Sequence, residues 1–242
     1  MKHTSPLLLR HPERIHPALW KGSQLAQAQR LTLSTGYAQL DRELPGGGWP
    51  IGSLIELTLE RAGIGEIALL QPALARLDSK RRIMFIQPPH VPHLHCWSAW
   101  KLPPQPLWIH TASLRDTLWA CEQTLRHNAC SALLCWASGA HPQELRRLHV
   151  AARQSDTLFI MLRSSVESRQ PCAAPLRLGL RSASHGLQVQ VLKRRGPVCE
   201  QAIPIALYPQ RAYSGAGSKH VSLDQPSSAL SQSGRRLSAV EH

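Results

Sequence analysis

Short apolar runs alternate with segments of helical periodicity through the middle of this chain. The apolar runs predict buried strands at 53–59, 83–86, 107–110, 132–136 and 157–162. Between them, Leu114, Leu118, Cys121 and Leu125 recur at helical spacing, and 142–153 repeats the pattern. Alternating strands and helices favour an α/β fold whose mainly parallel sheet is flanked by helices.

The two ends of the chain follow other patterns. Residues 176–180 and 187–192 alternate apolar and polar positions, which predicts an antiparallel hairpin at the C-terminal edge of the sheet. Residues 1–30 are interpreted as a polar arm in which Ile15, Leu19 and Trp20 share helical spacing and form a possible partner interface. We therefore expect an arm at 1–30, a core at 31–209 and a disordered basic tail at 210–242.

The composition adds a strong positive charge. Lys and Arg number 28 against 15 Asp and Glu, which gives a formal net charge of +13. Such a surface favours DNA, RNA, anionic membrane or acidic proteins as partners, or it serves only solubility. No apolar run reaches the length of a membrane span and no signal peptide is recognised, so we expect a cytoplasmic protein. The six cysteines form no CxxC pair and are expected to be reduced.

A glycine-bearing turn follows the first long strand, where α/β proteins often bind phosphate. Gly63 and Gly65 lie between that strand and an expected helix at 67–77. A working P-loop reads G-x-x-x-x-G-K-[ST], with Lys on the phosphates and a hydroxyl on Mg²⁺. Here Gly65 and Glu66 stand near the positions of that Lys and Ser/Thr. A carboxylate at this place repels a triphosphate, although it suits the helix dipole.

Two motifs before the turn carry a resemblance to known proteins. Residues 34–41 read S-T-G-x-x-x-L-D, and 45–57 read P-G-G-G-W-P-x-G-x-L-x-E-L, followed by A-G-I-G-E at 62–66. The first resembles the entry to the RecA core. The longer set is similar to the ImuA family, the RecA-like, partly SulA-like accessory proteins of the damage-inducible mutagenesis cassette. Weaker matches at 116–125, 175–178 and 191–197 extend the resemblance over about residues 11 to 208.

The resemblance implies a RecA-like P-loop NTPase core with a degenerate nucleotide site. In that register the catalytic Glu falls near Pro89 and the Mg²⁺-linked Asp near Trp136. Gly65 and Glu66 stand near the positions of the Lys and Thr, and Gly63 is the further turn glycine of this degenerate site. Losing charge neutralisation, metal anchoring and water activation together removes the basis of phosphoryl transfer. We therefore expect no enzyme activity, no catalytic residues and no cofactor, while ATP binding without hydrolysis stays open.

The resemblance also implies partners. They are RecA, an ImuB-type polymerase subunit and an error-prone DNA polymerase, which this chain would bridge during SOS-induced translesion DNA synthesis. An alternative is a SulA-like inhibitor of cell division that acts on FtsZ. A third reading, a DNA-stimulated ATPase, would need the Walker lysine that is missing.

Possible DNA contacts are placed by the same resemblance after the fourth core strand, at Arg163 and Arg169. The basic group Lys193, Arg194 and Arg195 adds to them. Contacts of this kind reach backbone phosphate and weaken with salt. No aromatic residue lies between 163 and 172, so base stacking is not expected there.

Two further groups of residues have simpler readings. His90, His93, His95 and Cys96 could supply metal ligands, but they lack paired spacing, so a polar loop and no metal site are expected. Six tryptophans are expected to lie mostly in the core: Trp49, Trp97, Trp100, Trp108, Trp119 and Trp136.

Overall fold

A computed structural model describes residues 31–90, 94–102, 106–196 and 201–207. The described residues all belong to one compact unit, Met1–Tyr208. The expected interface residues Ile15, Leu19 and Trp20 lie outside the described residues, and so does the expected tail at 210–242.

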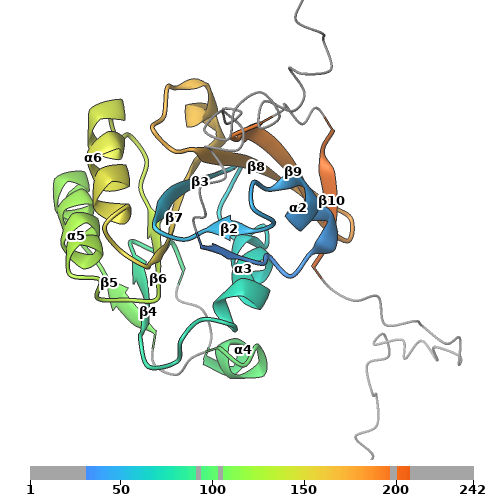
Figure 1. Ribbon diagram of the computed structural model, residues 1–242, viewed down its shortest axis with the longest axis horizontal. Helices are drawn as coiled ribbons and strands as arrows, with labels where there is room; N and C mark the ends of the chain where they lie inside the picture. Colours follow the sequence, from blue (N-terminus) through green and yellow to red (C-terminus); the bar gives the residue numbers. More distant parts are fainter. Residues whose placement is uncertain (1–30, 91–93, 103–105, 197–200, 208–242) are drawn as a thin grey trace, which may run out of the picture. The chain divides into compact units, whose positions relative to one another are not determined.

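An eight-stranded sheet forms the centre of the described part (Figure 1). Its order is β10-β9-β8-β3-β7-β6-β4-β5. The strands are β3 (Ser53–Leu59), β4 (Ile83–Ile86), β5 (Leu107–Ile109), β6 (Ala132–Trp136), β7 (Leu158–Ser164), β8 (Leu176–Ala183), β9 (Gly186–Lys193) and β10 (Ile203–Ala206). From β8 to β5 every neighbouring pair is parallel, whereas β9 and β10 join antiparallel. The expected α/β class, mostly parallel sheet and hairpin are confirmed, but β10 rather than the hairpin is the edge.

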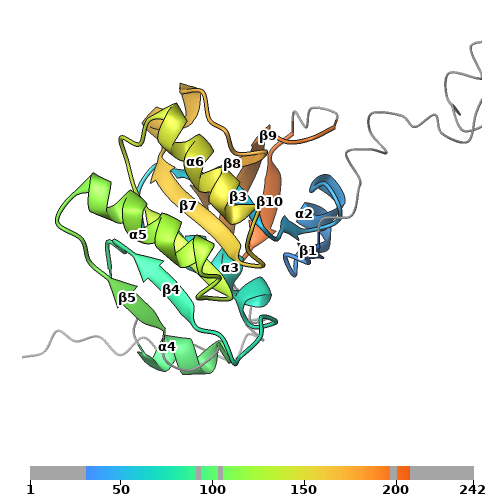
Figure 2. The same ribbon diagram turned by 60° about the vertical axis from the view of Figure 1, so that its left-hand side comes forward.

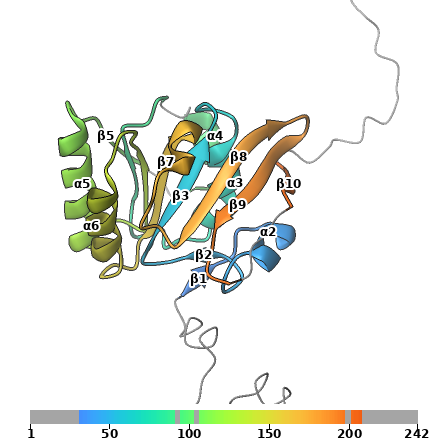
Figure 3. The ribbon, with the colours of Figure 1, turned by 90° about the horizontal axis from the view of Figure 1, so that it is seen from above.

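Helices cover both faces of the sheet (Figure 3). Helices α3 (Glu66–Leu74) and α4 (Leu94–Ala99) lie on one face, and α5 (Leu114–Arg126) and α6 (Pro142–Ala152) lie side by side on the other (Figure 2). Each face has its own apolar core, because alternate strand residues point to opposite sides. Along β3, for example, Ile55 belongs to the α3 side and Leu54 to the α6 side.

The helices begin where their first residues can satisfy free backbone amides. Ser113 caps α5 by accepting from the Asp116 amide, and Glu144 of α6 accepts from the His141 amide at 2.8 Å. The predicted inward faces are confirmed, with Leu118 of α5 and Leu148 of α6 both buried. Helix α3 is shorter than expected.

The S-T-G-x-x-x-L-D motif builds a turn on α3. The Asp41 carboxylate of α2 (Ala38–Glu43) accepts from Ser34 Oγ at 2.7 Å and from the Thr35 amide at 2.8 Å. Gly36 has a φ of 89°, and a Cβ there would collide with Pro72 of α3. Beside this turn, β1 (Thr32–Leu33) pairs with β2 (Trp49–Pro50). The motif therefore has a structural role, because it packs against the last turn of α3 at Pro72.

The tryptophans divide between core and surface. Phe85 stacks on Trp108 at 4.5 Å between ring centroids, and Trp97 meets Phe85 edge-on at 5.5 Å. Trp49 is fully buried, and Trp100 and Trp136 pack against the same core. Trp119 of α5 is 61% exposed and is the exception among the six tryptophans, which were expected to lie mostly in the core. Trp119 follows the buried Leu118 in sequence, but its side chain lies outside the buried stripe of α5.

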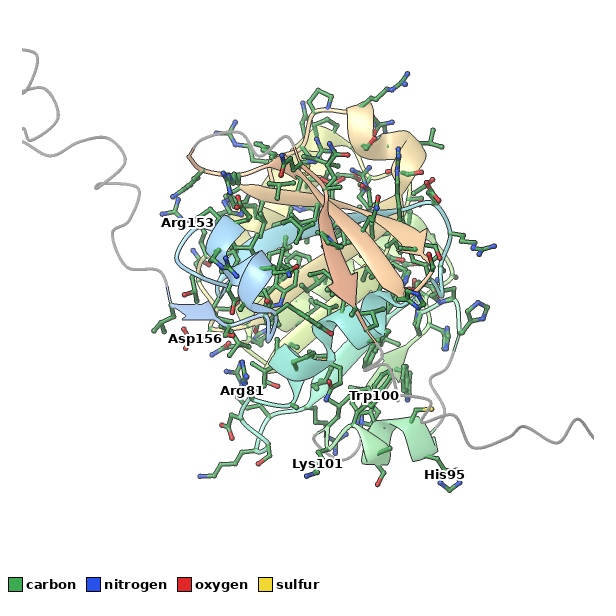
Figure 4. The ribbon with its side chains drawn as sticks, turned by 90° about the vertical axis from the view of Figure 1, so that its right-hand side faces the viewer. Arg81, His95, Trp100, Lys101, Arg153 and Asp156 are labelled. Carbon is green, nitrogen blue, oxygen red and sulfur yellow. The ribbon has the colours of Figure 1, made fainter. Side chains whose placement is uncertain are left out.

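The amino ends of the central strands are tied together at one end of the sheet. Asn128 Oδ1 accepts from Arg81 and from the Asp156 amide, which joins the loops before β4, β6 and β7. Arg81, Asp156 and Arg153 lie on the same side of the molecule (Figure 4). Among the described helices, none is both long enough and apolar enough to cross a membrane.

Candidate functional site

The turn between β3 and α3 is closed by the side chain of Glu66. Its carboxylate accepts from the Gly63 amide at 2.8 and 3.1 Å and from the Gly65 amide at 3.1 Å. Both glycines adopt positive φ, 82° at Gly63 and 117° at Gly65, which aims their amides into the turn. Glu66 is only 3% exposed. An internal carboxylate therefore occupies the concavity that amides at a helix N-terminus offer to an anion.

This arrangement explains what the glycines do. Amides that would face phosphate in a working P-loop are already bonded to a negatively charged group of the same chain. A triphosphate would have to displace Glu66, or bring its charge beside it, and Coulomb repulsion opposes the second. The residues present do not fit a bound Mg²⁺–nucleotide in the P-loop manner.

A leucine from the far edge of the sheet covers the same turn. A Cβ at Gly65 would collide with Leu207 Cδ1, and Leu187 of β9 lies next to that position. Leu207 also packs on the apolar core of the α3 face. The turn is thus held from inside by Glu66 and from outside by the chain end of β10.

A pocket of about 270 Å³ opens at the carboxyl ends of the parallel strands. This is the edge where α/β proteins bind their ligands. It is lined by Glu60, Arg61, Pro89, Trp136 and Arg163, among others. The expected counterparts of a catalytic Glu and a magnesium-linked Asp thus meet here as Pro89 and Trp136, which supply neither a base nor a metal ligand.

The residue after β4 carries backbone strain at this edge. Gln87 has a φ of 52°, a conformation that non-glycine residues rarely adopt. Its amide donates to Ile109 O at 2.9 Å, and its Nε2 donates to Thr111 O at 2.6 Å. These bonds use Gln87 to join β4 to the chain after β5, so the neutral side chain has a structural task.

Arg163 does not reach the surface, which corrects its expected contact with DNA. Its side chain is fully buried and forms ion pairs with Glu56 of β3, at 3.3 Å, and with Glu167. It also donates to Ala140 O at 3.1 Å. This guanidinium is buried between two carboxylates, out of reach of a phosphate at the surface.

The buried ion network extends to a third strand. Arg177 of β8 donates to Glu56 through Nε at 2.8 Å and Nη2 at 3.2 Å, and to Ser168 O at 3.0 Å. Sequence reasoning missed this network. One signal was present: a charged residue interrupts each of three apolar strands, as Glu56, Arg163 and Arg177.

Cys172 lies beside this network. Burial, followed by a hydrogen bond with Glu56, raises the pKa of the Cys172 thiol to about 11. Burial likewise raises the pKa of Cys130 to about 12. Both cysteines are free thiols, and their raised pKa values keep them protonated and unreactive near neutral pH.

The other expected basic residues differ in exposure. Arg169, Lys193 and Arg195 are exposed. Arg194 instead pairs with the Glu43 carboxylate at 2.8 Å and bonds to its carbonyl oxygen, which occupies its charge in anchoring α2.

A wider groove of about 470 Å³ lies beside Arg169. Glu60, Arg181, Gln188 and Gln190 also line it. The Lys193 ammonium donates to Cys172 O at 2.8 Å, which brings the end of β9 to the loop after η3 (Ser165–Arg169).

The structure describes only some of the residues that were considered as metal ligands. Within the described ranges, no three His, Cys, Asp or Glu side chains gather as a metal site would require. His95 and Cys96 are exposed on α4, while His93 lies outside the described residues.

The fold and the site define an α/β protein in which the glycine-bearing turn between β3 and α3 is bonded to the chain's own glutamate, Glu66. In comparisons with known proteins, no family model matches the chain and no curated protein matches its sequence.

Proposed function

We propose that this protein is a non-catalytic, RecA-like accessory factor of SOS-induced translesion DNA synthesis, acting in the cytoplasm. It would bridge RecA and an ImuB-type polymerase subunit with its error-prone polymerase. The observation that carries the proposal is the Glu66 carboxylate, bonded to the Gly63 and Gly65 amides where a phosphate would bind. A nucleotide-binding scaffold with its phosphate site occupied suits a role in protein assembly.

Two further observations support the proposal. The motifs at 34–41 and 45–66, which carry the resemblance to the ImuA family, form one continuous unit around β3 and α3. Pro89 and Trp136 line the pocket where hydrolysis would need a base and a metal ligand. Both observations favour a protein with a RecA-like architecture that does not hydrolyse ATP.

The role of DNA is secondary in this proposal. Arg169, Lys193 and Arg195 are exposed, and Lys193 reaches the loop that follows Arg169; all three suit contact with backbone phosphates. Glu60 on the adjoining groove limits the positive charge there. Such contact would add affinity in a complex that is mainly held by proteins.

The test uses the purified full chain as bait for RecA, an ImuB-type subunit and FtsZ, with ATP hydrolysis measured on the same preparation. We expect capture of RecA or the polymerase subunit, and no turnover with or without single-stranded DNA. Capture of FtsZ alone would favour the division inhibitor, and DNA-stimulated turnover would overturn the non-catalytic role. Glu66→Gln serves as the matched variant and should retain capture, because the turn is not the proposed contact.

A further inference from the structure

Helices α5 and α6 meet along an outward-facing line that combines arginines with exposed apolar side chains. Arg115, Trp119, Glu122 and Arg126 follow one another at spacings of three and four on α5, and so share one stripe. Arg147 and Val150 share a stripe on α6. We call these six residues the α5–α6 seam.

One ion pair between the helices shows that the two stripes meet at Glu122 and Arg147. Glu122 binds Arg126 of its own helix at 2.6 Å and Arg147 of α6 at 2.8 Å. Figure 2 shows the two helices side by side on the outer face of the sheet. Glu122 therefore lies between the helices, with Trp119 three residues before it on α5, and Val150 lies three residues after Arg147 on α6.

The apolar residues of the α5–α6 seam are unusually exposed. Trp119 is 61% exposed and Val150 is 52% exposed, although Leu118 and Cys121 on the same helix are buried. Tryptophan and arginine are the side chains most often found as binding anchors in protein interfaces. Trp119 is exposed and shares its stripe with Arg115 and Arg126. It is therefore suited to anchor a protein partner.

The charge of the α5–α6 seam selects the partner. The Glu122 side chain is 9% exposed, whereas those of Arg126 and Arg147 are 57% and 55% exposed, so the outward charge is positive. Complementary charge on a partner would be acidic. A second copy of this chain would bring arginines against arginines, which disfavours self-association through the seam.

Nucleic acid fits this surface less well than protein. Asp116 lies three residues before Trp119 on α5, and Glu144 lies in the first turn of α6, so the two helices carry negative as well as positive charge. A phosphate backbone needs a continuous positive track, which these carboxylates interrupt. An acidic protein segment can place neutral side chains opposite Asp116 and Glu144 and carboxylates opposite the arginines.

We propose that the α5–α6 seam binds an acidic, amphipathic helical segment of a protein partner, whose apolar side chain covers Trp119 while its carboxylates pair with the arginines. A helix laid along two parallel helices is a common mode of recognition. This inference concerns a different face from the turn at Glu66, and it does not depend on whether RecA is a partner.

The test measures binding of a fluorescent synthetic peptide to the full chain by anisotropy. The peptide is helical, with leucines at spacings of three and four and flanking glutamates. A second peptide replaces every glutamate by glutamine. Far-UV circular dichroism verifies that each variant is folded. Val166→Ala is the matched control, because Val166 is 83% exposed outside the seam.

We expect Trp119→Ala to weaken binding of the acidic peptide about 10-fold or more, the effect of losing an interface anchor. The glutamine peptide should bind more weakly, and Val166→Ala should bind as the parent does. Equal binding by Trp119→Ala, or no binding of the acidic peptide, would overturn the proposal.

Two parallel measurements separate the other occupants. If Trp119→Ala loses binding to single-stranded oligothymidylate instead, the seam is a nucleic-acid site and the proposal is wrong. If the parent sediments as a dimer and Trp119→Ala as a monomer, the occupant is a second copy. We expect neither change.

Discussion

The Glu66 carboxylate accepts a hydrogen bond of 2.8 Å from the amide of Gly63, three residues earlier in the chain. This bond closes the turn on itself and takes up an amide that a phosphate would need. It makes the turn a structural element that depends on one side chain.

We expect Glu66→Ala to lower the free energy of unfolding by about 1–3 kcal/mol, because it leaves amides in the turn without their acceptor. Urea unfolding followed by circular dichroism measures the change. Glu60→Ala is the control, since Glu60 is 53% exposed and its pair with Arg181 is 3.4 Å long, and it should change stability by less than about 0.5 kcal/mol. Equal effects of the two substitutions would contradict the role given to Glu66.

Removing the carboxylate should also free the concavity for an external anion. We expect millimolar pyrophosphate to raise the melting temperature of Glu66→Ala and to leave that of the parent unchanged, since ligands stabilise the state that binds them. Differential scanning fluorimetry with sulfate as a second anion measures this. A parent protein stabilised as strongly as the variant would mean that Glu66 does not occupy the site.

The buried network should be costly to break. Glu56→Ala leaves the buried Arg163 and Arg177 without their shared carboxylate, and we expect a loss of about 3–5 kcal/mol. The measurement is chemical unfolding at low and high salt, where a buried pair is screened little. Arg181→Ala removes an exposed pair and serves as the control. A loss that vanishes in high salt would place the network on the surface.

Alkaline pH should weaken the fold through Cys172. Its folded-state pKa is raised from 9.0 to about 11, mainly by burial, so the unfolded chain loses its thiol proton first. The contribution is fully present below pH 9.0 and is lost as pH rises toward about 11. We expect the unfolding midpoint of the parent to fall more steeply across this window than that of Cys172→Ala. Parallel pH profiles would show that Cys172 does not titrate differently in the two states.

The exposed basic residues should contribute to DNA binding where Arg163 does not. We expect replacing Arg169, Lys193 and Arg195 by alanine to weaken binding of single-stranded DNA regardless of sequence, and to reduce the salt slope by about one per lost phosphate contact. Fluorescence anisotropy over a salt series measures both. Arg153→Ala removes an exposed arginine outside this group and should bind as the parent does.

Deletion of residues 1–30 tests the proposed attachment to RecA. RecA protomers join through an N-terminal arm, and by analogy the arm here, with Ile15, Leu19 and Trp20, would pack on a RecA core. We expect the shortened protein to lose RecA capture while keeping the circular dichroism spectrum of a folded α/β core. Retained capture would exclude the arm as the contact.

The architecture could be predicted from the sequence because apolar residues recur at a regular spacing along each helix and form continuous runs in the central strands. The α5 face of Leu118, Cys121 and Leu125 is an example, since each lies at the spacing that buries one side of a helix. The edge strand β10 is as long as β4, but its four residues alternate buried and exposed positions and include Pro204, so they form no continuous apolar run.

The details of the candidate site could not be predicted, because they depend on contacts between separate elements and on backbone conformations in the turn. An arginine near the end of a strand, such as Arg163, is expected to be exposed, and its burial is explained by two carboxylates, Glu56 on the neighbouring strand and Glu167 in the segment that follows. Glu66 was recognised as unsuited to a triphosphate, but its bonds to the turn amides follow from backbone conformations at Gly63 and Gly65.

The left-handed backbone at Gly65 limits how this turn could be redesigned. A lysine introduced at position 65 would stand on a backbone with φ of 117°, which L side chains rarely adopt, and a hydroxyl residue introduced at 66 would leave the Gly63 and Gly65 amides without their carboxylate acceptor. Each substitution alone would cost stability. A phosphate-binding turn therefore cannot be built here by single side-chain replacements, because the backbone between Gly63 and Glu66 would have to change with them.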